Sequence, residues 1–82
     1  MRMLDPQKNV TAKELQIYLS VKEAKELRNQ LDRLLKDPEA FEHCHIYADD
    51  GSRQISVSIL TDRKMEHSQN YSELERRVFN EP

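Results

Sequence analysis

Two runs of alternating side chains flank the pair Asp50-Gly51, and this arrangement constrains the fold more than any other feature of the chain. Residues 42–48 precede the pair and residues 53–60 follow it. An Asp-Gly pair between alternating runs is the strongest short-range signal for a β-hairpin. The sequence therefore predicts two antiparallel strands joined by a tight turn.

A turn centred on this pair also predicts the register of the two strands. Ile46 lies opposite Ile55 and Cys44 lies opposite Val57, so these apolar side chains share one face. The other face collects imidazole, phenol, amide and hydroxyl groups: His43, His45, Tyr47, Gln54, Ser56 and Ser58. We expect one face to join the core and the polar face to stay open.

Two capping boxes mark the starts of helices. Ser20 with Glu23 and Ser72 with Glu75 both match the pattern in which a serine and a glutamate three residues later cap each other. Apolar residues follow the first box at spacings of three and four, as Val21, Ala24, Leu27, Leu31, Leu34 and Leu35. A second apolar stripe comprises Tyr71, Leu74 and Val78. The first helix is expected to end before Pro38.

Residues 13–20 alternate with a period of two, which predicts a first strand. A helix starting near Thr11 also fits the pattern. Residues 1–12 show little pattern and are expected to be a loose leader, whereas residues 13–82 are expected to form one domain. Residues 61–69 are polar and are expected to form a loop.

These elements predict an α+β two-layer sandwich with the order β-α-β-β-α. A right-handed crossover makes the first two strands parallel. Placing the third strand in the centre predicts a three-stranded mixed sheet of order 1-3-2, with two helices on one face. Pairing of the first strand on the other side of the hairpin remains an alternative.

Composition narrows the function classes. The chain has 82 residues and a net charge of −2, from 13 Lys and Arg against 15 Asp and Glu, so no polyionic partner is indicated. Its single cysteine cannot form an internal disulfide, which is consistent with a reducing cytoplasm. Because no signal peptide and no run of about 20 apolar residues occurs, we expect a cytoplasmic protein without a membrane span.

The sequence contains only weak evidence for a catalytic site or a metal site. His43 and His45 share one side of a strand and form a candidate metal pair, but a zinc site needs three or four ligands. Cys44 points to the other side, so neither imidazole readily takes its proton. The single glycine, Gly51, belongs to the turn and leaves none for a phosphate loop. We expect no enzyme activity and no cofactor, with metal binding by His43 and His45 as an alternative.

Nucleic-acid binding is a further alternative, because Tyr18 and Tyr47 on the open face could stack bases. The basic residues of the first helix, which are Lys22, Lys25, Arg28 and Arg33, would have to assist. They are expected on the opposite side from the tyrosines, and the chain is net acidic, so this interpretation is disfavoured.

Protein binding fits the open face best, since it mixes aromatic and adaptable polar groups. Either outer strand could also pair with another chain, including a second copy in a homodimer. The expected contacts are Tyr18, His43, His45, Tyr47, Gln54, Ser56 and Ser58. A small acidic protein without a catalytic set is typical of inhibitors, such as immunity proteins against bacterial toxins or phage-encoded blockers of host defence. The sequence therefore predicts a non-catalytic interaction module that binds and blocks a partner protein.

Overall fold

The structure is a computed structural model that describes residues 1–82. It divides into two compact units. One unit is the continuous segment Tyr18–Asp62, and the other combines Met1–Ile17 with Arg63–Pro82. Each unit is built from one two-stranded antiparallel sheet and helical segments. The α+β content predicted from the sequence is therefore confirmed.

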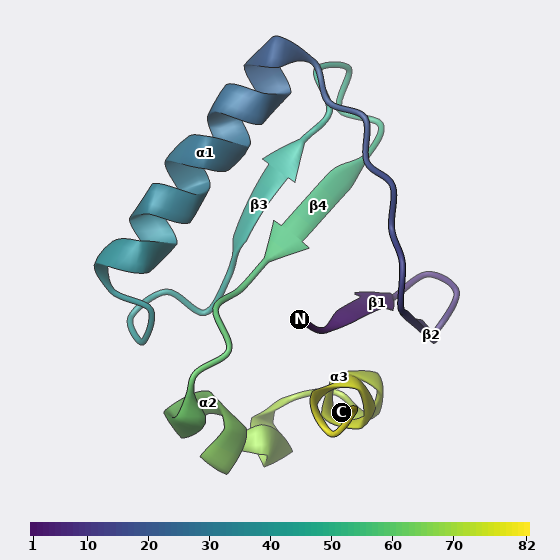
Figure 1. Cartoon of the computed structure of the whole chain (residues 1–82), viewed down its shortest axis with the longest axis vertical. Helices are drawn as coiled ribbons and strands as arrows, with labels where there is room; N and C mark the ends of the chain where they lie inside the picture. Colours follow the sequence, from purple (N-terminus) through teal and green to yellow (C-terminus); the bar gives the residue numbers. More distant parts are fainter. The chain divides into compact units, whose positions relative to one another are not determined.

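The unit Tyr18–Asp62 contains helix α1 (Val21–Lys36) and the strands β3 (Cys44–Tyr47) and β4 (Gln54–Val57). The strands pair antiparallel, and α1 lies against β3 (Figure 1). One helix therefore covers one face of a two-stranded sheet and leaves the other face open.

The hairpin has the register predicted from its sequence. Cys44 pairs with Val57, and Ile46 pairs with Ile55. Gly51 adopts a φ of +75° in the connecting turn, a left-handed conformation that glycine reaches without a steric penalty. The position of this single glycine therefore sets the turn, and the turn sets the face on which each strand residue lies.

The first capping box forms as predicted and also joins the helix to the hairpin. The Glu23 amide donates to the Ser20 Oγ at 3.0 Å, and the Ser20 amide donates to the Glu23 Oε1 at 2.7 Å. The Asp49 amide donates to the Glu23 Oε2 at 2.9 Å, and the Ser20 hydroxyl donates to the Asp49 carboxylate at 2.8 Å. The start of α1 is thereby fixed beside the turn that follows β3.

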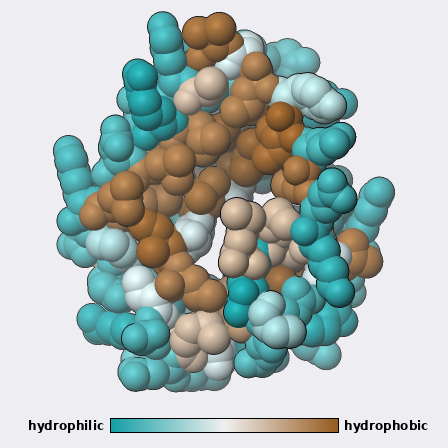
Figure 2. All heavy atoms as spheres, in the orientation of Figure 1, coloured by the Kyte–Doolittle hydropathy of each residue, from teal (hydrophilic) through white to brown (hydrophobic).

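The core of this unit is small, because two strands cannot cover the whole apolar stripe of α1. Leu34 is 1% exposed, and Cys44 and Ile46 of β3 are also buried, whereas Leu31 and Leu35 are 38% and 66% exposed. Figure 2 shows apolar side chains gathered along α1 and the neighbouring strands on one face. A stripe predicted to be buried along its full width is therefore buried only where α1 meets β3.

The second unit contains the strands β1 (Met3–Asp5) and β2 (Val10–Ala12) and helix α3 (Glu73–Phe79). Helix α3 packs on both strands and is preceded by the short helix α2 (Asp62–Glu66) and the 3-10 turn Ser68–Asn70 (Figure 1). Residues 61–69, which were predicted to form a loop, are thus largely helical.

Helix α3 begins at the second predicted capping box and buries two residues of its predicted stripe. Ser72 is the N-cap, with Glu75 closing the box. Leu74 and Val78 are 8% and 1% exposed, which confirms their assignment to the core. The unit Met1–Ile17 with Arg63–Pro82 therefore has its own buried apolar residues.

The predicted three-stranded mixed sheet is wrong. The structure has two separate two-stranded antiparallel sheets and three α-helices, and residues 13–20 belong to neither sheet. Leu15, Ile17 and Leu19 remain 59%, 49% and 37% exposed. A period of two identifies extended backbone, but it does not determine whether a neighbouring strand accepts its hydrogen bonds. The order 1-3-2, with two helices on one face, is overturned for this reason.

Residues 3–12, taken from the sequence as part of a loose leader, form the β1–β2 hairpin instead. The Asp5 carboxylate accepts hydrogen bonds from the amides of Gln7 and Lys8 at 3.0 and 3.2 Å, which closes the turn. Asn9 has a φ of +58°, a left-handed conformation that asparagine tolerates better than most residues. The sequence signal for this hairpin is the turn chemistry of Asp5 and Asn9, because strands of only three residues are too short to show a clear alternation.

Candidate functional site

The open face of the β3–β4 hairpin carries a row of three rings along one strand. The rings of His43 and His45 pack edge to face with centroids 4.7 Å apart. The Tyr47 ring follows at 6.2 Å from the His45 ring with a tilt of 32°. Tyr47 is 59% exposed, so the row presents an aromatic surface to solvent.

Two serine hydroxyl groups, one on β4 and one just after it, make hydrogen bonds next to this row. The Ser56 Oγ and the His45 Nδ1 lie 2.7 Å apart in a cross-strand hydrogen bond. The Ser58 hydroxyl donates to the Glu42 carbonyl oxygen beside the start of the row. The contact with Ser56 holds the orientation of the His45 ring.

The structure places six of the predicted contact residues on or next to this hairpin and one outside it. His45, Tyr47, Gln54 and Ser56 form two cross-strand pairs, His45 with Ser56 and Tyr47 with Gln54. His43 and Ser58 flank the paired strands. Tyr18 lies in the extended segment before α1 and is 89% exposed. The open face therefore consists of His43, His45, Tyr47, Gln54, Ser56 and Ser58.

A metal site on this face would need a third ligand beside the two histidines. The structure contains no group of three or more His, Cys, Asp and Glu residues placed to hold a metal ion. The Nδ1 of His45 is also engaged by Ser56. The pair His43 and His45 is therefore better described as part of an aromatic and hydrogen-bonding row.

Cys44 lies on the covered side of β3, between the strand and α1. It is 9% exposed, and this burial raises the pKa of its thiol above the ordinary value. Because the thiolate is the nucleophilic form, burial makes Cys44 a poor nucleophile. Its side chain acts as a small apolar core residue.

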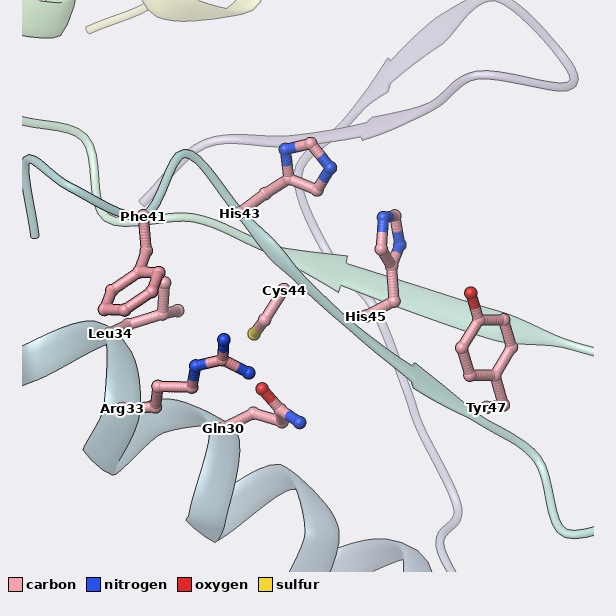
Figure 3. A pocket seen from close by; sticks show the side chains of 8 residues that line it. All are labelled: Gln30, Arg33, Leu34, Phe41, His43, Cys44, His45 and Tyr47. Carbon is pink, nitrogen blue, oxygen red and sulfur yellow. The ribbon is translucent and has the colours of Figure 1, made fainter.

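A hollow of about 290 Å³ runs along the outer edge of β3, which we call the β3-edge groove. Figure 3 shows Gln30 and Arg33 pointing from α1 toward β3, while His43 and His45 project from the opposite side of the strand. The groove is lined by Gln30, Arg33, Leu34, Phe41, His43, Cys44, His45 and Tyr47. It therefore joins the edge of the open face to the side of the strand covered by α1.

Arg33 and Phe41 form one end of this groove and were not recognised as site residues from the sequence. The guanidinium carbon of Arg33 lies 4.9 Å from the centre of the Phe41 ring, within the range of a cation–π contact. The sequence places Arg33 only among the basic residues of the first helix, on the opposite side from the tyrosines. The sequence signal for this contact is Phe41, an aromatic residue that follows the end of the helix and can fold back onto its last turns.

Backbone hydrogen bonds show which groups of β3 face the groove. The Ala48 amide donates to the Arg53 carbonyl oxygen at 2.9 Å, so these residues form a hydrogen-bonded pair. Hydrogen-bonded and non-hydrogen-bonded pairs alternate along an antiparallel ladder. Ile46 therefore bonds toward β4, whereas His45 and Tyr47 direct their N–H and C=O groups to the outer edge. Strand β3 has no second strand neighbour on that edge.

Comparisons with protein-family models, with curated proteins and with solved structures find no match to this chain. None of its helices is both long and apolar enough to span a membrane.

Proposed function

We propose that the protein is a non-catalytic interaction module that binds and blocks a partner protein through the open face of the β3–β4 hairpin. The observation that carries this proposal is the exposed row of His43, His45 and Tyr47, oriented by the cross-strand bond to Ser56. Rigid aromatic groups beside adaptable polar groups contribute strongly to protein interfaces at a low entropic cost.

No observation favours the nucleic-acid alternative. Lys22, Lys25 and Arg28 belong to α1, which lies against the opposite face of β3 from Tyr47. A nucleic-acid strand stacked on Tyr47 would therefore run away from most of the basic residues that should neutralise its phosphates.

Site-specific photo-crosslinking tests the proposal in extracts of the native cell. The photoreactive residue p-benzoylphenylalanine is placed at position 47 on the open face, and at position 28 on α1 as a matched exposed control. We expect one polypeptide to be captured at position 47 and not at position 28, and untagged protein to compete for it.

A double variant, His45→Ala with Tyr47→Ala, then tests the row itself. The variant should keep its far-ultraviolet circular dichroism spectrum and lose the captured polypeptide. Unchanged binding by a folded variant would refute the open-face proposal. Capture of a second copy would identify the module as a homodimer, and nuclease-sensitive capture would favour nucleic acid.

A further inference from the structure

The outer edge of β3 offers a set of backbone groups that only another extended chain can satisfy together. His45 and Tyr47 each present an N–H and a C=O to the β3-edge groove. Exposed edges in natural proteins are commonly blunted by lysine or proline, yet β3 reads Cys-His-Ile-Tyr and contains neither. Neither of these two blocking residues is therefore present on the four residues of β3.

The two sides of the groove determine the side-chain pattern of such a strand. On the side covered by α1 the groove combines the apolar Leu34, Phe41 and Cys44 with the polar groups of Gln30 and Arg33. On the open side it is bordered by His45 and Tyr47. Because strand side chains alternate, an added strand would place apolar residues toward α1 and polar or aromatic residues beside the ring row.

Charge determines the direction of the added strand. Arg33 lies at the end of the groove where β3 begins, beside Phe41, and no carboxylate lines the groove. Glu26 lies two turns earlier in α1, toward the end where β3 finishes, and accepts a hydrogen bond from Gln30 at 3.0 Å. A strand antiparallel to β3 brings its carboxyl end to Arg33, whereas a parallel strand brings its amino end there.

A second copy of the hairpin does not fit this edge. Helix α1 packs on β3, so pairing β3 with the β3 of another copy would place two helices above strands about 4.8 Å apart. Packed helices need about 8–10 Å between their axes. The occupant must therefore be an extended segment without a covering helix. The volume of about 290 Å³ is also at the lower limit for small-molecule pockets, which span roughly 300–1,000 Å³.

We infer that the β3-edge groove binds an extended peptide segment of the partner, which adds to β3 as an antiparallel strand and places a carboxylate against Arg33. This inference rests on the proposed interaction function and names the recognised element. The carboxylate is either a chain terminus or an Asp or Glu side chain, and both present the same chemistry to the guanidinium.

A random octapeptide library with free carboxyl termini, panned against the full 82-residue chain, tests the inference. We expect enriched peptides with alternating apolar residues and a carboxylate at or near the end. Amidation distinguishes the two sources, because it weakens only the peptides whose terminal carboxylate is bound. Removing the bound carboxylate should weaken binding about tenfold, the loss expected for one charge-assisted hydrogen bond.

Variants and spectra then locate the bound peptide. Arg33→Gln should reproduce the loss caused by removing the carboxylate, while Arg28→Gln, on the same helix outside the groove, should leave affinity unchanged. N-methylation of alternate peptide amides should abolish binding. Amide resonances of His45 and Tyr47 should shift more than those of Gln54 and Ser56.

Three results would overturn the inference: no enriched peptide, equal affinity for Arg33→Gln and the unchanged protein, or resonance shifts confined to β4. The open-face function can be judged separately. A crosslinker at position 54, which is on the open face but does not line the groove, separates the two proposals. If it captures a partner when the library yields nothing, the proposed function is supported and the strand-addition inference fails. If it captures nothing while the peptides bind at β3, the groove inference is supported and the open-face function fails.

Discussion

The backbone amide of Asp49 donates a 2.9 Å hydrogen bond to the Oε2 of Glu23, the carboxylate whose other oxygen caps helix α1. In most helices such a capping carboxylate makes only local hydrogen bonds. Here the Glu23 carboxylate also joins α1 to the β3–β4 turn. The β3-edge groove lies between α1 and the edge of β3, so this carboxylate helps to hold its two sides in place.

Removing the hydroxyl of Ser20 should destabilise α1 more than the same change at Ser72 destabilises α3. Loss of a serine cap costs about 1 kcal/mol, and Ser20 also donates to Asp49 at 2.8 Å. Amide hydrogen exchange of α1 in Ser20→Ala, compared with α3 in Ser72→Ala, measures the difference. Equal losses in the two helices would show that the bond to Asp49 contributes nothing.

Acid should loosen the contact between α1 and the turn. Backbone hydrogen bonds from Ser20 and then Asp49 lower the pKa of Glu23 below its ordinary value of 4.5. Because the folded pKa is lower than the unfolded one, this stabilisation is present above the unfolded pKa and is lost as pH falls through the folded pKa. Hydrogen exchange of the Asp49 amide, followed from about pH 6 to about pH 3 with correction for intrinsic rates, should show the loss.

The variant Glu23→Gln is the control for this acid effect. Glutamine still offers one acceptor to the cap but carries no titratable charge. In this variant we expect a weaker contact between residue 23 and the Asp49 amide at neutral pH. The exchange of that amide should also depend less on pH than it does in the unchanged protein. An identical pH dependence in both proteins would assign the acid sensitivity to another group.

Two adjacent leucines should differ sharply in their effect on stability. Leu34 is 1% exposed and Leu35 is 66% exposed. Leu34→Ala should cost about 2–5 kcal/mol through lost burial and a residual cavity, whereas Leu35→Ala should change stability by less than about 0.5 kcal/mol. Urea denaturation followed by circular dichroism measures both. If Leu34→Ala fails to fold, Leu34→Met supplies a milder change, expected to cost less than about 1.5 kcal/mol.

Replacing Gly51 tests the conformation of the hairpin turn without a steric complication. A β-carbon at this position would meet no atom within 4 Å, so the cost of Gly51→Ala comes from its φ of +75°. We expect a loss of about 1–2 kcal/mol for alanine and a smaller loss for asparagine, which tolerates this conformation better. If thermal denaturation shows that alanine and asparagine reduce stability by similar amounts, the positive φ of Gly51 is not the cause of the loss.

The thiol of Cys44 should react slowly in the folded protein. It is 9% exposed, and burial raises its pKa, so the reactive thiolate is scarce at neutral pH. Modification by Ellman's reagent should be much slower in buffer than in concentrated urea. Equal rates in the two solutions would show that α1 does not cover this side of β3.

The elements that the sequence determined are those whose signals are local. The turn at Gly51 and the boxes beginning at Ser20 and Ser72 involve residues within a few positions of one another, and the structure confirms them. The set on the open face followed from alternation once the turn was located. Short-range hydrogen bonds and side-chain alternation depend on sequence spacing alone, which is why they could be predicted.

The tertiary structure alone decided which strands pair and which apolar surfaces are covered. Residues 13–20 alternate, yet they join no sheet, while residues 3–12 form a hairpin. The approach of Arg33 to Phe41, which completes the β3-edge groove, depends on how α1 packs on β3. Strand pairing and helix packing are long-range choices between surfaces of similar hydrophobicity, and only the balance of burial in the folded chain distinguishes them.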